Sequence, residues 1–106
     1  MGLFSKKKNN EVEIKAKDKI IFKEMVNDDN LARDLVLELK NGNPLVINFS
    51  KLNEMDANKM IPFFEGAALA LEGKTVMISE EIYLFALKEC FLDGTLKQFI
   101  ENIPSN

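Results

Sequence analysis

Residues 44–73, PLVINFSKLNEMDANKMIPFFEGAALALEG, decide the fold. The run that begins at Leu45 is apolar apart from Asn48, which is typical of a central strand covered on both faces. Asn53 then offers a helix N-cap, and Asp56 favours the positive end of the helix dipole. An apolar set follows at helical spacing: Ala57, Met60, Ile61, Phe64, Ala68 and Leu71. The stretch therefore predicts a buried strand followed by a helix.

The residues before this stretch predict a strand and a helix. KIIFKEMV at 19–26 is short and partly β-branched, which favours a strand. Asp28, Asp29 or Asn30 can cap a helix, and Gly42 provides a turn out of it. Its apolar stripe is Leu31, Ala32, Leu35, Val36 and Leu39. A strand, a helix and a central strand in this order indicate a right-handed crossover.

The residues after it predict two strands and a short helix. KTVMIS and IYLFA form the strands, joined by a tight turn at 79–81, and GTLKQFIENI is a short final helix. The order β-α-β-α-β-β, with that C-terminal helix, predicts an α/β fold. We expect a two-layer sandwich whose helices pack on one small mixed sheet.

The helix within residues 54–73 carries two further features. Pro62 removes a backbone hydrogen bond, so we expect it to kink the helix or to divide it near Ile61. Its apolar surface is also broader than one core stripe, because Phe63, Gly66, Ala67 and Ala70 lie on the flank. Such a helix is buried on more than one side. Either the subunit wraps it more fully, or these four residues form a two-fold homodimer interface.

The charge is unevenly distributed. Residues 1–19 hold six lysines against three acidic residues, a net of +3, so the remainder carries −6 because the whole chain is −3. An acidic body argues against a nucleic-acid partner. We expect an N-terminal arm with a short linker at 1–17 and a core domain at 18–106. In the arm, apolar residues adjoin a lysine triplet that suits an anionic lipid surface: Leu3, Phe4, Lys6, Lys7 and Lys8. The alternative is a solvated tail.

The chain offers little for catalysis. It has no histidine, the commonest general base and zinc ligand, and its one cysteine, Cys90, lies among apolar neighbours. The acidic pairs suit helix caps and turns, and no phosphate-binding glycine loop is present. We therefore expect neither an enzyme nor a cofactor or metal site, and we expect a binding or scaffold module in a reducing cytoplasm.

The order of these motifs resembles the SepF family of cell-division proteins. Asn48 matches the family's strand asparagine, and Gly94–Thr95–Leu96 resembles its SGT motif near the end. The helix matches at Asp56, Ala57, Phe63, Phe64, Gly66, Ala67 and Ala70, and the hairpin matches at Ile78, Ile82, Tyr83 and Leu84. The resemblance covers about residues 20–100 together with the amphipathic start.

The resemblance implies a division scaffold. It implies a dimer able to assemble further, with Gly66 at a protein–protein contact and an N-terminal amphipathic helix on the inner face of the membrane at the division site. It also implies binding of the C-terminal peptide of the tubulin-like FtsZ, through Tyr83 and Leu84. Met77 replaces the family's basic residue before the hairpin turn, so ionic contact with an acidic tail is weaker or passes to Lys74. A STAS-type regulatory domain is the alternative.

Overall fold

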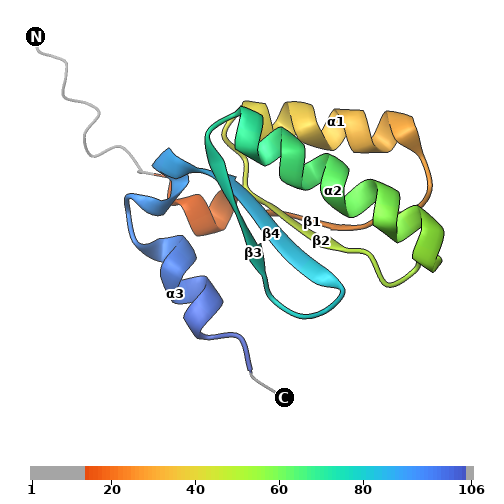
Figure 1. Cartoon of the computed structure of the whole chain (residues 1–106). Coiled ribbons are helices and arrows are strands. Elements are labelled where there is room, and N and C mark those ends of the chain that lie inside the picture. Colours follow the sequence, from red (N-terminus) through yellow and green to blue (C-terminus); the bar gives the residue numbers. More distant parts are fainter. Residues whose placement is uncertain (1–13, 105–106) are drawn as a thin grey trace, which may run out of the picture.

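The computed structural model describes residues 14–104, which form three α-helices, four strands and two short 3-10 helices (Figure 1). In chain order these elements are η1 (Ala16–Lys19), β1 (Ile21–Glu24), α1 (Asp29–Lys40), β2 (Leu45–Asn48), α2 (Glu54–Ala70), β3 (Gly73–Met77), β4 (Ile82–Leu87), η2 (Lys88–Phe91) and α3 (Thr95–Glu101). The expected α/β fold is confirmed. Ala16 and Lys17, which the sequence analysis placed in the arm, form the first turn of η1.

The four strands form one mixed sheet in the order β1-β2-β4-β3. β1 and β2 run parallel, joined by the crossover through α1, and the other two pairings are antiparallel. The parallel pair needs a long connection and the antiparallel pair β3–β4 needs only a hairpin, which is why a helix lies in one connection and a turn in the other. β2 is an interior strand, as its apolar run predicts.

Side-chain caps start the two long helices where the sequence predicts. Oδ1 of Asp28 accepts the N–H groups of Asn30 and Leu31 at 2.9 and 3.1 Å. Oδ1 of Asn53 accepts the N–H of Asp56 at 2.8 Å. Each cap satisfies donors that have no partner inside the first helical turn.

Pro62 lies inside α2 without ending it. The helix runs unbroken through 17 residues, so the expected division near Ile61 is wrong. Pro62 has no N–H group, so the one helical hydrogen bond that is lost is the bond to the carbonyl of Asn58, four residues earlier. Both Asn58 and Pro62 are exposed, so water can hydrate that carbonyl. The packing of the opposite side of α2 then holds the helix together.

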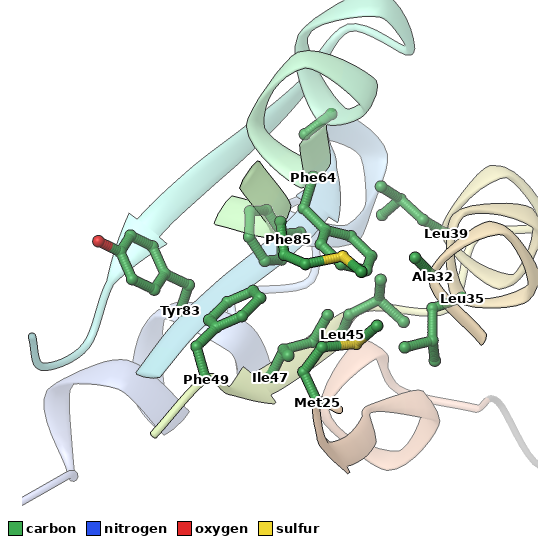
Figure 2. Packing of buried hydrophobic residues seen from close by; sticks show 12 residues of the cluster. Met25, Ala32, Leu35, Leu39, Leu45, Ile47, Phe49, Phe64, Tyr83 and Phe85 are labelled. Atoms are coloured by element: carbon green, nitrogen blue, oxygen red, sulfur yellow. The ribbon is translucent and has the colours of Figure 1, made fainter. Parts of the chain in front are cut away.

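The two faces of the sheet have separate cores. Leu45 and Ile47 point toward α1 and α2, while Val46 between them points to the other face. Figure 2 shows the first cluster, in which the rings of Phe49, Phe64 and Phe85 meet with centroids 5.5–6.5 Å apart. The short elements η1, η2 and α3 cover the second face, on the other side of the sheet from α1 and α2 (Figure 1).

Candidate interaction surfaces

One side of α2 faces solvent and is mostly apolar, although the exposed Lys59 also lies on it. This outer face of α2 consists of Met55, Pro62, Phe63, Gly66, Leu69 and Ala70. Met55 and Leu69 are among its most exposed members, at 80% and 77%. The opposite side of the same helix buries Met60, Phe64 and Ala68 in the first core. A helix that is apolar on both sides is typical of one that is covered twice.

Gly66 has no packing role within the subunit. A Cβ atom placed on it would meet nothing within 4 Å among the described residues, and its backbone is helical. Glycine inside a helix is unfavourable relative to alanine by about 0.5–1 kcal/mol. The glycine is therefore not explained by the fold of one chain.

The predicted dimer residues lie together on this helix. Phe63, Gly66 and Ala70 belong to the outer face, and Ala67 is half-buried at its border. Phe63 is 45% exposed, and its ring packs edge-on against Phe64 with centroids 5.3 Å apart. Beside Phe63, a groove of about 260 Å³ between α1 and α2 is lined by Asp29, Ala32, Lys59, Met60 and Phe63. The ion pair of Lys59 and Asp29, at 3.5 Å, lies at this groove. Sequence reasoning missed Met55 and Leu69, although their helical spacing places them on the same side.

The hairpin places Met77 and Tyr83 on the α2 side of the sheet. The two residues are register partners across β3 and β4, so their side chains share a face. Met77 is 61% exposed. Tyr83 is only 8% exposed, and its ring stacks on Phe85 with centroids 6.2 Å apart. Figure 2 shows its hydroxyl directed away from the cluster, at the outer edge of the core.

Lys74 and Leu84 lie on the opposite face. Nζ of Lys74 is 5.3 Å from the ring centroid of Phe91 in η2. Leu84 is fully buried in the second core, so the structure leaves it no surface for a partner. The structure thus divides the four candidate FtsZ-binding residues between two faces, because side chains alternate along a strand.

The candidate lipid-binding residues Leu3, Phe4, Lys6, Lys7 and Lys8 lie outside the described residues. Where the described chain begins, the N–H of Ala16 donates to Oδ2 of Asp93 at 2.9 Å, and the N–H of Lys17 donates to Oγ1 of Thr95 at 3.0 Å. These two bonds fasten the start of the folded unit to the start of α3.

The described residues hold little for catalysis. Within residues 14–104 no group of three or more histidine, cysteine and acidic side chains is arranged to hold a metal. Burial raises the pKa of the Cys90 thiol, whose Sγ donates to the carbonyl of Gly42 at 3.4 Å. A raised pKa keeps the thiol protonated and unreactive. Over the same range, no helix has the length and apolar character needed to cross a bilayer.

Comparison with known proteins identifies the family. The family model described as "Cell division protein SepF" matches residues 26–89, from the loop after β1 into η2. The SepF of Ruminiclostridium cellulolyticum is 33% identical over 84 residues, which cover 76% of this chain and 54% of that protein. SepF 2 of Desulforamulus reducens is 36% identical over 67 residues, covering 61% of this chain and 42% of that protein.

A third relative, the SepF of Thermoanaerobacter sp. strain X514, is 32% identical over 66 residues, or 62% of this chain and 48% of that protein. The chain therefore spans about half the length of the curated relatives that it matches. The family model covers strands β2, β3 and β4 and both long helices, and this assignment replaces the STAS-type alternative. The chain belongs to the SepF family of cell division proteins.

Proposed function

We propose that this chain is a non-enzymatic division scaffold that pairs with itself, binds the C-terminal tail of FtsZ and tethers it to the membrane. It would act at the cytoplasmic face of the membrane, at the division site. The observation that carries the proposal is the apolar outer face of α2 in a chain of the SepF family. An exposed apolar patch of this kind marks an interaction site.

Pairing would bring the outer face of α2 against the same face of a second copy. A two-fold contact is self-complementary, so Gly66 and Ala70 would approach their counterparts closely. Burying the exposed side chains of Met55 and Leu69 would contribute about 1.5–3 kcal/mol each before ordering costs. The folded unit, which begins with η1 at Ala16, would carry this contact, and the N-terminal arm before it would carry the membrane contact.

The membrane contact would be weak for one chain and adequate for a pair. Leu3 and Phe4 would each contribute about 1.5–3 kcal/mol by entering the lipid interface. The triplet Lys6, Lys7 and Lys8 would add about 1 kcal/mol per charge on an anionic surface. Two arms on one dimer bind far more tightly than one, since the second arm binds at a high effective concentration. Pairing and anchoring would therefore be coupled.

The FtsZ contact would use the exposed end of the hairpin on the α2 side. Met77 offers an exposed apolar side chain, and the hydroxyl edge of Tyr83 lies on the same face. An apolar anchor from the peptide would pack on Met77, while a polar group would meet the tyrosine hydroxyl. Lys74 points to the other face and would act at most through long-range charge.

Co-sedimentation with vesicles tests the proposal. FtsZ is mixed with vesicles of phosphatidylcholine and phosphatidylglycerol, with or without the full chain, and pelleted FtsZ is measured. We expect FtsZ to pellet only when the full chain is present. A chain lacking residues 1–8 should bind FtsZ in solution yet leave it in the supernatant.

Two matched variants separate the parts of the arm. Phe4→Ser keeps the lysine triplet, and replacement of all three lysines by glutamine keeps Leu3 and Phe4. Each variant should reduce the amount of pelleted FtsZ. Only for Phe4→Ser, which keeps the lysines, should the remaining pelleted FtsZ still fall as salt is added. If the full chain brings no FtsZ down with the vesicles, the tethering function is wrong.

A further inference from the structure

The four methionines of residues 14–104 fall into two classes of exposure. Met25 is 0% exposed and Met60 is 2% exposed, and both belong to the first core. Met55 is 80% exposed and Met77 is 61% exposed. A thioether in a packed core meets an oxidant only when the structure opens, whereas one at the surface meets it directly. The fold therefore protects two of these methionines from oxidation and exposes the other two.

Met55 lies where a chemical change would alter the outer face of α2 without disturbing the core. It is in the first turn of the helix, between the acidic residues Glu54 and Asp56. Met60, on the same helix, points into the first core instead. Because Met55 is so exposed, it contributes almost nothing to the packing of its own subunit. Its modification should therefore leave the subunit folded.

Oxidation converts the methionine side chain from an apolar group into a polar one. Hydrogen peroxide transfers one oxygen atom to the thioether sulfur, so the sulfur is oxidised to the sulfoxide and the peroxide is reduced to water. The sulfoxide oxygen accepts hydrogen bonds from water, and burying it in an apolar contact would remove them without replacement. Methionine sulfoxide reductases reverse the step with a thiol reductant, which leaves as a disulfide while the oxygen leaves as water.

We propose that Met55 is an oxidation site that controls self-association: peroxide oxidation prevents pairing through the outer face of α2, and enzymatic reduction restores it. This inference rests on the proposed pairing through that face. Pairing would itself cover the Met55 sulfur, so the unpaired subunit is the form that reacts and the oxidised subunit stays unpaired. Met77 lies on β3, outside this face, so its oxidation would leave pairing unchanged.

Peptide mapping by mass spectrometry tests the reactivity. The full chain is treated with dilute hydrogen peroxide, and the oxygen gained by each methionine is followed over time. Where the protein is too dilute to pair, Met55 and Met77 should be oxidised several-fold faster than Met25 and Met60. Where the chain pairs, oxidation of Met55 should slow several-fold and that of Met77 should not. Gly66→Lys, which should not pair, should show no slowing at Met55.

Sedimentation equilibrium of the oxidised full chain tests the consequence for pairing. The dissociation constant of the pair should rise at least about tenfold, because each subunit loses the apolar contact of one side chain. Peptide mapping of the same sample verifies that Met25 and Met60 remain unoxidised, so the loss of pairing does not come from a damaged core. Treatment with methionine sulfoxide reductases and dithiothreitol should restore the original dissociation constant.

Three variants assign the effect to Met55. Met55→Leu keeps an apolar side chain of similar volume and has no sulfur, so it should pair like the parent before and after peroxide treatment. Met77→Leu is the matched control, because it removes the other exposed thioether and should still lose pairing on oxidation. Met55→Gln is polar, as the sulfoxide is, and should pair several-fold more weakly than the parent without any oxidant.

The outcomes separate this inference from the proposed function. A chain that is fully oxidised at Met55 and pairs as strongly as the untreated parent would overturn the control by oxidation while leaving the pairing intact. So would a Met55→Leu chain that loses pairing on peroxide treatment to the same extent as the parent. A parent chain that does not pair before oxidation would refute the proposed pairing, and the control by oxidation with it.

Discussion

The N–H of Ala16 donates to the Asp93 carboxylate at 2.9 Å although 77 residues separate the two in the chain. The bond joins the beginning of the described structure to the start of its last helix. Together with the bonds from Thr95 to Asp93, this bond lies beside the second core, to which β2, β4 and α3 contribute side chains. Several properties of the protein are expected to depend on this connection and on the contrast between the two sides of α2.

Acid should weaken the folded state through Asp93. Its pKa is lowered from 3.8 to about 2 by the bonds from Ala16 and Thr95. A depressed pKa stabilises the fold above the unfolded value of 3.8, and the stabilisation is lost as the pH falls toward about 2. The parent chain should therefore lose stability across this window, measured by urea unfolding at several pH values.

Asp93→Asn should remove this part of the pH dependence, and Glu101→Gln should leave it unchanged. A carboxyl pKa near 2 in an NMR titration of Asp93 would support the same conclusion. If Asp93→Asn shows the same loss of stability between pH 4 and pH 2 as the parent, the bonds to Asp93 do not stabilise the fold.

Two adjacent phenylalanines should respond differently to truncation. Phe64 is fully buried, whereas Phe63 next to it is 45% exposed on the outer face of α2. Phe64→Ala should lower the free energy of unfolding by about 3–5 kcal/mol, since it leaves a cavity in the aromatic cluster. Phe63→Ala should cost less than about 1 kcal/mol in the isolated subunit. Chemical denaturation at low protein concentration measures the free energy of unfolding of both variants. Equal losses of stability would contradict the conclusion that Phe64 is on the buried side of α2 and Phe63 on the outer side.

Two glycines seven residues apart should also differ. Gly66→Ala should stabilise the subunit by about 0.5–1 kcal/mol, because the helix gains a better helix former and the new methyl group meets nothing. Gly73→Ala should destabilise it by about 1–3 kcal/mol, because the added Cβ would lie 2.5 Å from the carbonyl oxygen of Ala86. Thermal unfolding measures both. A stabilising Gly73→Ala would show that β3 can move away from β4 without cost.

The proposed FtsZ-peptide contact can be tested with two variants on β3, one on each face of the sheet. Met77→Ser should weaken binding of an FtsZ C-terminal peptide about tenfold, which corresponds to ~1.4 kcal/mol of lost apolar contact. Lys74→Ala, three residues away on the other face, should change it less than about twofold. Fluorescence anisotropy of a labelled peptide measures both affinities. A larger loss for Lys74→Ala would place the peptide on the α3 side of the sheet.

Local patterns allowed much of the fold to be predicted from the sequence. Asp28 and Asn53 were recognisable as caps because their partners lie within three residues, and β2 was recognisable because a doubly covered strand is continuously apolar. The bond from Ala16 to Asp93 was not predictable, since no local pattern links positions so far apart. Pro62 was expected to kink α2 or to divide it near Ile61; the helix is not divided, because tertiary packing outweighs one missing hydrogen bond.

The candidate sites were predictable in part, for similar reasons. Helical spacing placed Phe63, Gly66 and Ala70 on one exposed side of α2, whereas Ala67, predicted with them, is half-buried at the border of that side. The resemblance grouped Tyr83 with Leu84, yet neighbouring residues of a strand point to opposite faces, and Leu84 is buried. The alternation of the strand was visible in the sequence and would have separated the two residues.

Sedimentation equilibrium of the full chain tests the central claim most directly, namely that the outer face of α2 pairs two molecules. The parent chain should show twice the 12.0 kDa subunit mass at micromolar concentration. Gly66→Lys, which places a charge in the middle of that face, should show the mass of one folded subunit. A parent chain that remains at 12.0 kDa at every concentration, or a Gly66→Lys variant that pairs as strongly as the parent, would contradict the account.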